Sequence, residues 1–124
     1  MKPEKGKINQ SAPLTYSLKL RLNKESKFFG PGVAQLLCLV EETQSLNVAS
    51  QTMEMAYSKA WRIIKIAEEA LGYPLLVRKV GGMNGGGSIV TDKGKEFVRK
   101  FLILQEEAYQ IVDVLFKKHF SQPS

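Results

Sequence analysis

Two helical segments separated by about three residues constrain the fold of this chain more than any other feature. Residues 48–53 are long enough for a short helix, and Asn47 is its expected N-cap. A second helical pattern covers residues 57–71 and ends before Gly72, a residue type favoured just past the end of a helix. A short helix joined this tightly to a longer one predicts a helix-turn-helix.

The sequence before this pair predicts a strand and another helix. Apolar and polar side chains alternate over residues 14–22, which is the pattern of a half-buried strand. Turn-forming residues at 23–32 would end that strand. Apolar residues then recur at i, i+3, i+4 and i+7 across 33–40, which predicts an amphipathic helix with Pro31 in its first turn.

A glycine-rich segment follows the pair and lies between two β-prone runs, at 74–80 and 88–91. In the stretch VGGMNGGGS, five of nine residues are glycine. The G-x-x-x-x-G spacing of a P-loop occurs here, but Gly87 stands where that motif needs a lysine. The segment therefore predicts a β-hairpin. Its glycines either let the tip approach a partner closely or only permit a tight turn.

A long helix is predicted at 92–116, with Thr91 or Asp92 as its N-cap. Its apolar residues are spaced four and three apart, as in a coiled-coil seam, and one wide core-facing surface is the alternative interpretation. The seam residues, which we expect to mediate dimerisation, are Phe97, Phe101, Leu104, Ala108, Ile111 and Leu115.

Taken in order, these elements predict a mainly α domain with a small β-hairpin. The fold class is a winged helix-turn-helix with a long C-terminal dimerisation helix. We expect this domain to occupy residues 14–120, after a flexible tail at 1–13 that lacks an apolar signal core. No apolar stretch reaches the about 18 residues needed to span a membrane, so we expect a cytoplasmic protein without membrane partners.

The sequence offers little for catalysis or metal binding. Cys38 and His119 are the only cysteine and the only histidine, and they lie far apart in the chain, so neither a disulfide nor a zinc site is expected. Cys38 falls in an apolar helical run and is expected to be a packed thiol. Adjacent acidic pairs on the predicted helices point about 100° apart and do not converge. We expect no enzyme activity, no cofactor and no metal.

The net charge of +6 is concentrated in part of the chain. Residues 57–100 carry nine basic and four acidic side chains, and this block includes the second helix of the pair and the glycine-rich hairpin. A basic segment around a defined element is typical of nucleic-acid binders. A solvated basic surface is the alternative interpretation.

The motifs YSKAWR at 57–62 and LVRKVGGMNGGGSIVTDKGKEFV at 76–98 resemble the N-terminal DNA-binding domain of the ModE family of molybdate-responsive regulators. That domain is related to the LysR-type DNA-binding domain, and the resemblance covers residues 16–116. It implies a transcriptional regulator that binds an inverted-repeat operator in double-stranded DNA as a homodimer. The family's molybdate-binding TOBE domains have no expected counterpart after residue 116, so no molybdate site is expected in this chain.

Two residues depart from the family pattern. Glu54 stands in the tight turn where a glycine is common, and Ala56 stands where the second helix commonly has a capping serine. A left-handed backbone conformation costs glutamate about 1 kcal/mol more than glycine. A missing side-chain cap costs a similar amount, about 1 kcal/mol.

A recognition helix enters the major groove with its N-terminal residues toward the bases, and this places the expected contacts. Arg62 could bind guanine O6 and N7, whereas Tyr57 and Ser58 suit phosphates. Trp61 is expected to pack in the core, and stacking on the sugar–phosphate backbone is the alternative interpretation. The full expected DNA-binding set is Asn47, Tyr57, Ser58, Lys59, Arg62, Lys65, Arg78, Lys79, Asn84, Gly85 and Gly86. The alternative function is a protein-interaction module, or a DNA-binding subunit that pairs with a separate ligand-sensing chain.

Overall fold

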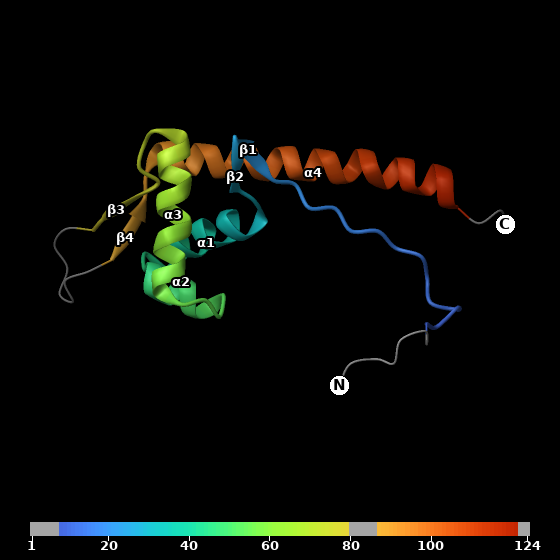
Figure 1. Ribbon diagram of the computed structural model, residues 1–124, viewed down its shortest axis with the longest axis horizontal. Coiled ribbons are helices and arrows are strands. Elements are labelled where there is room, and N and C mark those ends of the chain that lie inside the picture. The colour runs from blue at the N-terminus through green and yellow to red at the C-terminus, as the bar shows by residue number, and fades with distance from the viewer. Residues whose placement is uncertain (1–7, 80–86, 122–124) are drawn as a thin grey trace.

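The computed structural model describes residues 8–79 and 87–121. Figure 1 shows a group of shorter helices under one end of a much longer helix, with a β-hairpin projecting from that group. This arrangement confirms the predicted mainly α winged helix-turn-helix with a long C-terminal helix. The elements are β1 (Leu22–Lys24), β2 (Ser26–Phe29), α1 (Pro31–Thr43), α2 (Leu46–Thr52), α3 (Tyr57–Leu71), β3 (Leu76–Arg78), β4 (Ser88–Val90) and α4 (Asp92–Phe120).

The strand predicted at 14–22 is wrong. Residues 13–21 have no regular secondary structure. Antiparallel pairing begins only at Leu22, the last residue of the predicted strand, and continues in the segment that was expected to be a turn. The alternation of apolar residues does not reflect a strand, because the segment lies along α4 and not in a sheet. Tyr109 Oη donates a hydrogen bond to the Leu18 carbonyl at 2.9 Å, and the Tyr16 ring lies 4.9 Å from the Phe116 ring.

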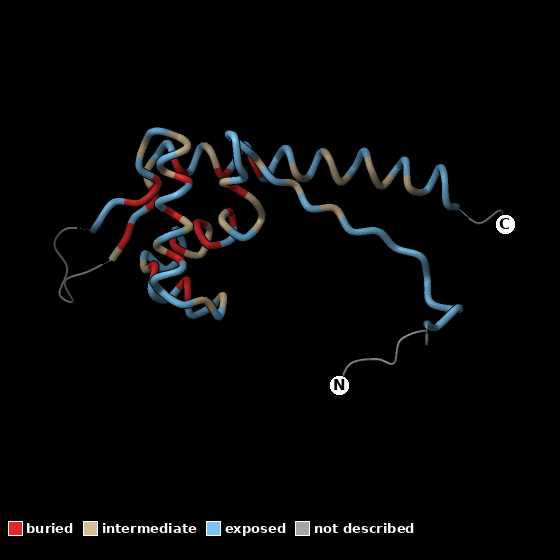
Figure 2. The backbone as a smooth tube through the Cα atoms, in the orientation of Figure 1, coloured by how far each residue is buried: buried red, intermediate tan, exposed pale blue. Residues whose placement is uncertain are grey.

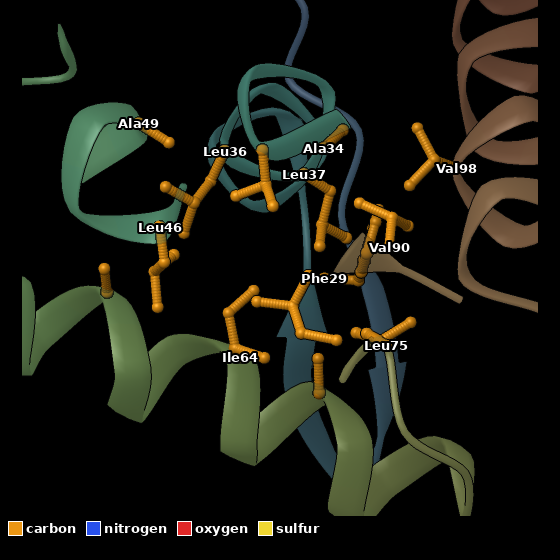
Figure 3. Close-up of a cluster of buried hydrophobic side chains, with 14 of the residues drawn as sticks. Phe29, Ala34, Leu36, Leu37, Leu46, Ala49, Ile64, Leu75, Val90 and Val98 are labelled. Atoms are coloured by element: carbon orange, nitrogen blue, oxygen red, sulfur yellow. The ribbon is translucent and has the colours of Figure 1, made fainter. Parts of the chain in front are cut away.

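The core lies where α1, α2 and α3 meet the first turns of α4 and the β3–β4 hairpin, which is called the wing below (Figure 2). Phe29 of β2 occupies its centre, between α1 and α3 in Figure 3. The centroid of the Phe29 ring lies 4.8 Å from that of the Phe97 ring and 5.0 Å from that of the Phe101 ring, and both ring pairs meet edge-on. Edge-to-face aromatic packing stabilises a core beyond the area it buries. Thus β2, although only four residues long, joins the helix-turn-helix to α4.

The predicted helix at 33–40 is confirmed as α1, which buries Leu36, Leu37 and Val40 and leaves Val33 half-buried. The second half of the domain is confirmed in the same way. Strands β3 and β4 pair antiparallel, as predicted for the glycine-rich hairpin. Gly72 ends α3 in the left-handed region, with φ of 82°.

The predicted N-cap of α2 is wrong. The helix begins at Leu46, so Asn47 lies inside its first turn, and Ser45 is the cap. Ser45 Oγ accepts a hydrogen bond from the Val48 amide at 3.0 Å. Serine and asparagine are both good N-cap residues. Ser45 is the cap because the helix starts two residues earlier than its apolar pattern indicated.

The turn between α2 and α3 has the expected strain. Glu54 adopts a left-handed conformation with φ of 54°, and Ala56 caps α3 without a side-chain hydrogen bond. The Met55 amide donates to the Ser50 carbonyl at 2.8 Å, and the Met55 side chain packs against the core. Ala49 and Ser50 are buried, so α3 can cross α2 closely.

The N-terminus of α4 is fixed by its cap and by a close contact. Thr91 Oγ1 accepts from the Gly94 amide at 3.0 Å and donates to the Pro74 carbonyl at 2.7 Å. A Cβ on Gly94 would lie 3.1 Å from the Leu75 carbonyl oxygen, which leaves little room for a larger residue. The Thr-x-x-Gly motif therefore attaches the long helix to the base of the wing.

The long helix extends to Phe120, one turn beyond its predicted end. Phe101 of the predicted dimerisation seam is only 2% exposed in the core of its own domain, and Phe97 is half-buried against the same core, so both contribute to intramolecular packing. A heptad pattern alone does not distinguish intramolecular from intermolecular packing. Among the described residues, none of the helices is long and apolar enough to cross a membrane.

Candidate nucleic-acid interface

The N-terminal half of α3 separates a buried face from an exposed one. Ala60 and Ile64 have no exposed surface, whereas Ser58, Lys59 and Arg62 are exposed. The helical period of 3.6 residues places these two sets on different sides of the helix. Two cations and a hydroxyl are thus presented to solvent by a helix that the core holds in place.

A hollow of ≈ 280 Å³ connects this helix to α2 and to the wing. It brings together three of the expected DNA-binding residues, which are Asn47 from α2, Tyr57 from α3 and Arg78 from β3. Trp61 forms part of its wall. The hollow therefore gathers a guanidinium, an amide and a phenol hydroxyl, and these groups can hydrogen-bond an anionic oxygen.

Trp61 is half-buried and packs against the core, as expected from the sequence. The Tyr57 ring meets it edge-on, with 6.3 Å between ring centroids. Lys65 Nζ lies 5.3 Å from the centre of the Trp61 ring and 3.4 Å from Glu68 Oε1. The structure thus folds Lys65 along its own helix and does not place it in the hollow.

The base of the wing is attached to the turn between α1 and α2 through Gln44. The Ser88 amide donates to the Gln44 carbonyl at 3.0 Å, and Lys79 Nζ donates to Gln44 Oε1. Gln44 itself is left-handed, with φ of 55°. A Cβ on Gly87 would lie 2.8 Å from the same carbonyl oxygen, so glycine is needed here for close approach. The other wing residues that are predicted to bind DNA, Asn84, Gly85 and Gly86, lie outside the described residues.

Sequence reasoning missed Gln44 because its role depends on a contact between segments far apart in the chain. The left-handed (αL) backbone conformation of Gln44 could not be predicted from the sequence either, because glutamine is not a residue that favours this conformation. Ser45 could have been found, because serine is as good an N-cap as asparagine.

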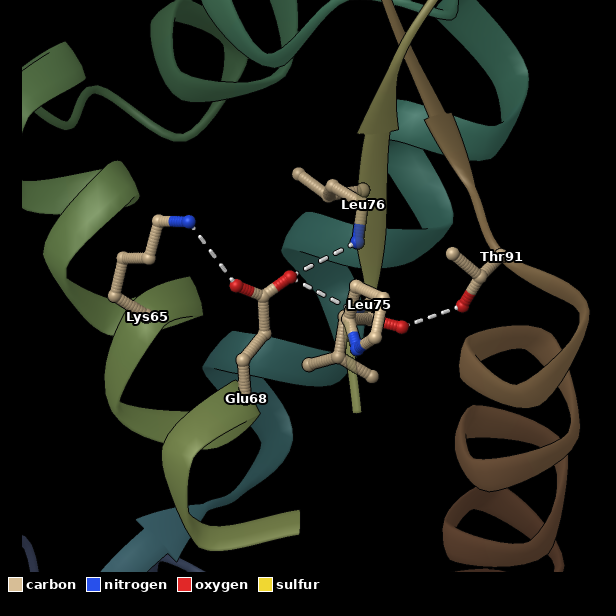
Figure 4. Close-up of polar contacts among 6 residues, drawn as sticks. Lys65, Glu68, Leu75, Leu76 and Thr91 are labelled. Carbon is tan, nitrogen blue, oxygen red and sulfur yellow. Dashed lines mark hydrogen bonds and ion pairs between the residues drawn. The ribbon is translucent and has the colours of Figure 1, made fainter. Parts of the chain in front are cut away.

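Glu68 fixes the angle between α3 and the wing (Figure 4). Its Oε2 accepts hydrogen bonds from the Leu75 amide at 2.7 Å and the Leu76 amide at 3.2 Å. Because β3 begins at Leu76, this carboxylate satisfies backbone donors that the two-stranded hairpin leaves unpaired. Glu68 therefore links α3 directly to the start of the wing, in addition to the contacts that Gln44 makes with the wing base.

We expect Glu68→Ala to lower the free energy of unfolding by about 1–3 kcal/mol, because it leaves two amides without their acceptor. Urea unfolding followed by circular dichroism would measure this loss. Glu69→Ala is the matched control, since its exposed neighbour on the same helix should change stability by less than about 0.5 kcal/mol. Equal effects of the two substitutions would contradict the role given to Glu68.

Cys38 lies outside this face and packs against the core, as expected for a structural thiol. Burial raises the pKa of the Cys38 thiol, and the nearby carboxylates of Glu41 and Glu42 raise it further. The thiolate form, which is the nucleophile, is therefore disfavoured.

Comparison with known proteins agrees with this geometry. Residues 33–95 match the family described as bacterial regulatory helix-turn-helix protein, lysR family, and this range runs from α1 to the first turn of α4.

Three curated relatives are similar to the chain. The molybdenum transport protein ModE of Azotobacter vinelandii is 32% identical over 84 residues, which are 68% of this chain and 31% of that protein. The transcriptional regulator ModE of Haemophilus influenzae is 28% identical over 92 residues, 72% of this chain and 36% of that protein. The DNA-binding transcriptional dual regulator ModE of Escherichia coli K12 is 25% identical over 104 residues, 84% of this chain and 38% of that protein. The chain spans about a third of the length of these relatives.

Proposed function

Because this chain belongs to the lysR family of bacterial regulatory helix-turn-helix proteins, we propose that it is a ModE-like transcriptional regulator that binds an inverted-repeat operator in double-stranded DNA as a homodimer. The observation that carries the proposal is the exposed, cationic N-terminal half of α3, whose Tyr57 and Trp61 line one hollow together with Arg78 of the wing. This face offers a helix for the major groove and a cation for the adjacent backbone.

In the proposed complex, α3 lies in the major groove with Arg62 toward the base edges. A guanidinium can donate two parallel hydrogen bonds to guanine O6 and N7, which distinguishes guanine from the other bases. Ser58 and Lys59 would contact phosphates and fix the orientation of the helix. The hollow lined by Asn47, Tyr57 and Arg78 has groups suited to one backbone phosphate.

The wing would contact the neighbouring strand. Arg78 and Lys79 lead into it, and Asn84, Gly85 and Gly86 are proposed to approach the phosphates or the minor groove. Lys79 already binds Gln44, so we assign it the role of holding the wing base, with a phosphate contact as its second role.

The distal part of α4 supports the proposed dimer. Beyond the core, this helix carries the exposed apolar side chains of Leu102, Ile103, Leu104, Ile111, Val114, Leu115 and Phe120. The helical period places Leu104, Ile111 and Leu115 of this set on one face, and a soluble monomer rarely leaves such a stripe uncovered. Leu104, Ile111 and Leu115 share the predicted seam with half-buried Ala108. A symmetric pairing of two such helices would place two copies of α3 on one DNA molecule.

We expect Arg62→Ala to weaken binding to the selected operator by about 1–3 kcal/mol and to relax preference at one base pair of each half-site. Titration of the variant against the operator and its single-base derivatives, at one fixed salt concentration, measures both effects. Lys59→Ala serves as the comparison, because loss of a phosphate contact should weaken binding to all sequences about equally. An equal loss for Arg62→Ala on specific and random DNA would refute its assignment.

A further inference from the structure

A second hollow, here called the hairpin groove, lies on another side of α3. It is bounded by residues 19–21, which precede the β1–β2 hairpin, by β2 of that hairpin, by the start of α1 and by α3, and its volume is ≈ 270 Å³. Its apolar lining includes Phe28, Val33, Met55, Ile63 and Ile66. The volume is close to the lower end of small-molecule sites, which measure about 300–1,000 Å³.

The groove also has a positive rim. Lys19, Arg21 and Lys27 line it, and no carboxylate does. None of these three cations belongs to an ion pair within residues 8–79 and 87–121. Three like charges around one apolar depression repel one another, and an anion seated among them would relieve that repulsion.

The apolar lining and the positive rim of the groove suit different parts of one ligand. A neutral apolar compound would leave the cations without a counter-charge, and an inorganic anion would leave Ile66, which is 47% exposed, in contact with water. A ligand that carries an anionic head on an apolar body satisfies both. Charge-assisted hydrogen bonds to a carboxylate, sulfonate or phosphate are about twice as strong as neutral ones.

We propose that the hairpin groove binds a small anionic amphiphile, with its apolar body against Met55, Ile63 and Ile66 and its head group among Lys19, Arg21 and Lys27. The volume favours a ligand of one or two rings over a segment of another protein. Met55 belongs to the turn before α3, and Ile63 and Ile66 belong to α3 itself. The site therefore contacts the helix that carries Arg62 without using any of the residues proposed to contact DNA.

The test uses the full chain without DNA, so that its result is independent of the proposed regulator function. The probe is 8-anilinonaphthalene-1-sulfonate, and its neutral counterpart is N-phenyl-1-naphthylamine. Carbon–proton correlation NMR spectra of the isoleucine and methionine methyl groups locate the probe. Ile103 and Ile111 on α4 act as internal references. We expect saturable shifts at Ile63, Ile66 and Met55, and binding of the neutral compound that is weaker by about tenfold or more.

The double substitution Arg21→Gln with Lys27→Gln should weaken binding of the sulfonate by about tenfold or more, because it removes two of the three charged donors. Lys95→Gln with Lys118→Gln is the matched control, as both lysines are exposed on α4 and do not line the groove. Unchanged methyl spectra of each free variant verify that it folds.

Three results would overturn the proposal. One is a set of shifts confined to Ile103 and Ile111, which would place the probe on the exposed face of α4. Another is equal affinity for the neutral and the anionic compound. The third is a double variant of the groove cations that binds the sulfonate as tightly as the wild-type protein does.

Discussion

Replacing Ile111 with aspartate is expected to convert the proposed dimer into a monomer and to weaken operator binding by about 10²–10⁴-fold. Ile111 is 63% exposed on α4, beyond the part of the helix that contacts its own core. In the dimer its side chain would be covered by the partner helix, and a carboxylate there would be buried without a counter-charge. A monomer reaches only one half-site, so it loses the gain from binding two linked sites.

Sedimentation at micromolar concentration measures the first effect, and titration of the operator measures the second. Wild-type protein should sediment at twice the monomer mass of 13.9 kDa, and the variant at the monomer mass. Gln110→Asp, which adds the same charge at a neighbouring exposed position away from the seam, should remain a dimer. Dimeric Ile111→Asp with undiminished affinity would show that this stripe is not the interface. A wild-type monomer, or assembly only with a different chain, would contradict the homodimer.

Replacing Phe29 with alanine is expected to lower the free energy of unfolding by about 3–5 kcal/mol. The Phe29 side chain is 2% exposed and lies within 5.0 Å of two other phenylalanine rings, measured between centroids. The substitution leaves a cavity and also removes two edge-to-face contacts. Since small domains are stable by only about 5–15 kcal/mol, this single change removes a large part of the total.

Urea unfolding at one protein concentration measures this loss, because the stability of an associating protein depends on concentration. Phe28→Ala is the matched comparison. Phe28 is half-buried, and its ring centre lies 6.4 Å from that of Phe97, so a smaller loss is expected. Equal losses at the two positions would contradict the central place of Phe29 in the core.

The parts of the fold that local patterns determine could be predicted from the sequence. Helices α1, α3 and α4 follow from apolar periodicity, and Gly72 and Thr91 end or begin them by local backbone chemistry. The β1–β2 hairpin could not be predicted in the same way. Its strands are short, and Phe29 is buried through contacts with α4, about 70 residues later in the chain.

The candidate site likewise has a part that local sequence patterns predict and a part that they do not predict. The exposed residues of α3 follow from helical geometry, so Ser58, Lys59 and Arg62 could be predicted. The contacts that place the wing relative to α3 are made by Gln44 and Glu68 with residues distant from them in sequence, and no local pattern indicates them. Such contacts form only after the chain has folded, and they also decide which predicted cations remain available to a ligand.

Selection of bound fragments from a random pool of double-stranded DNA tests the central claim most directly. Wild-type protein should enrich an inverted repeat with two equivalent half-sites, whose centres lie about one helical turn of 10–10.5 base pairs, or a multiple of it, apart. Such a repeat would report both base reading by α3 and the symmetry of the dimer. A pool that remains random after repeated selection, or that yields a single half-site without its symmetry mate, would contradict the account.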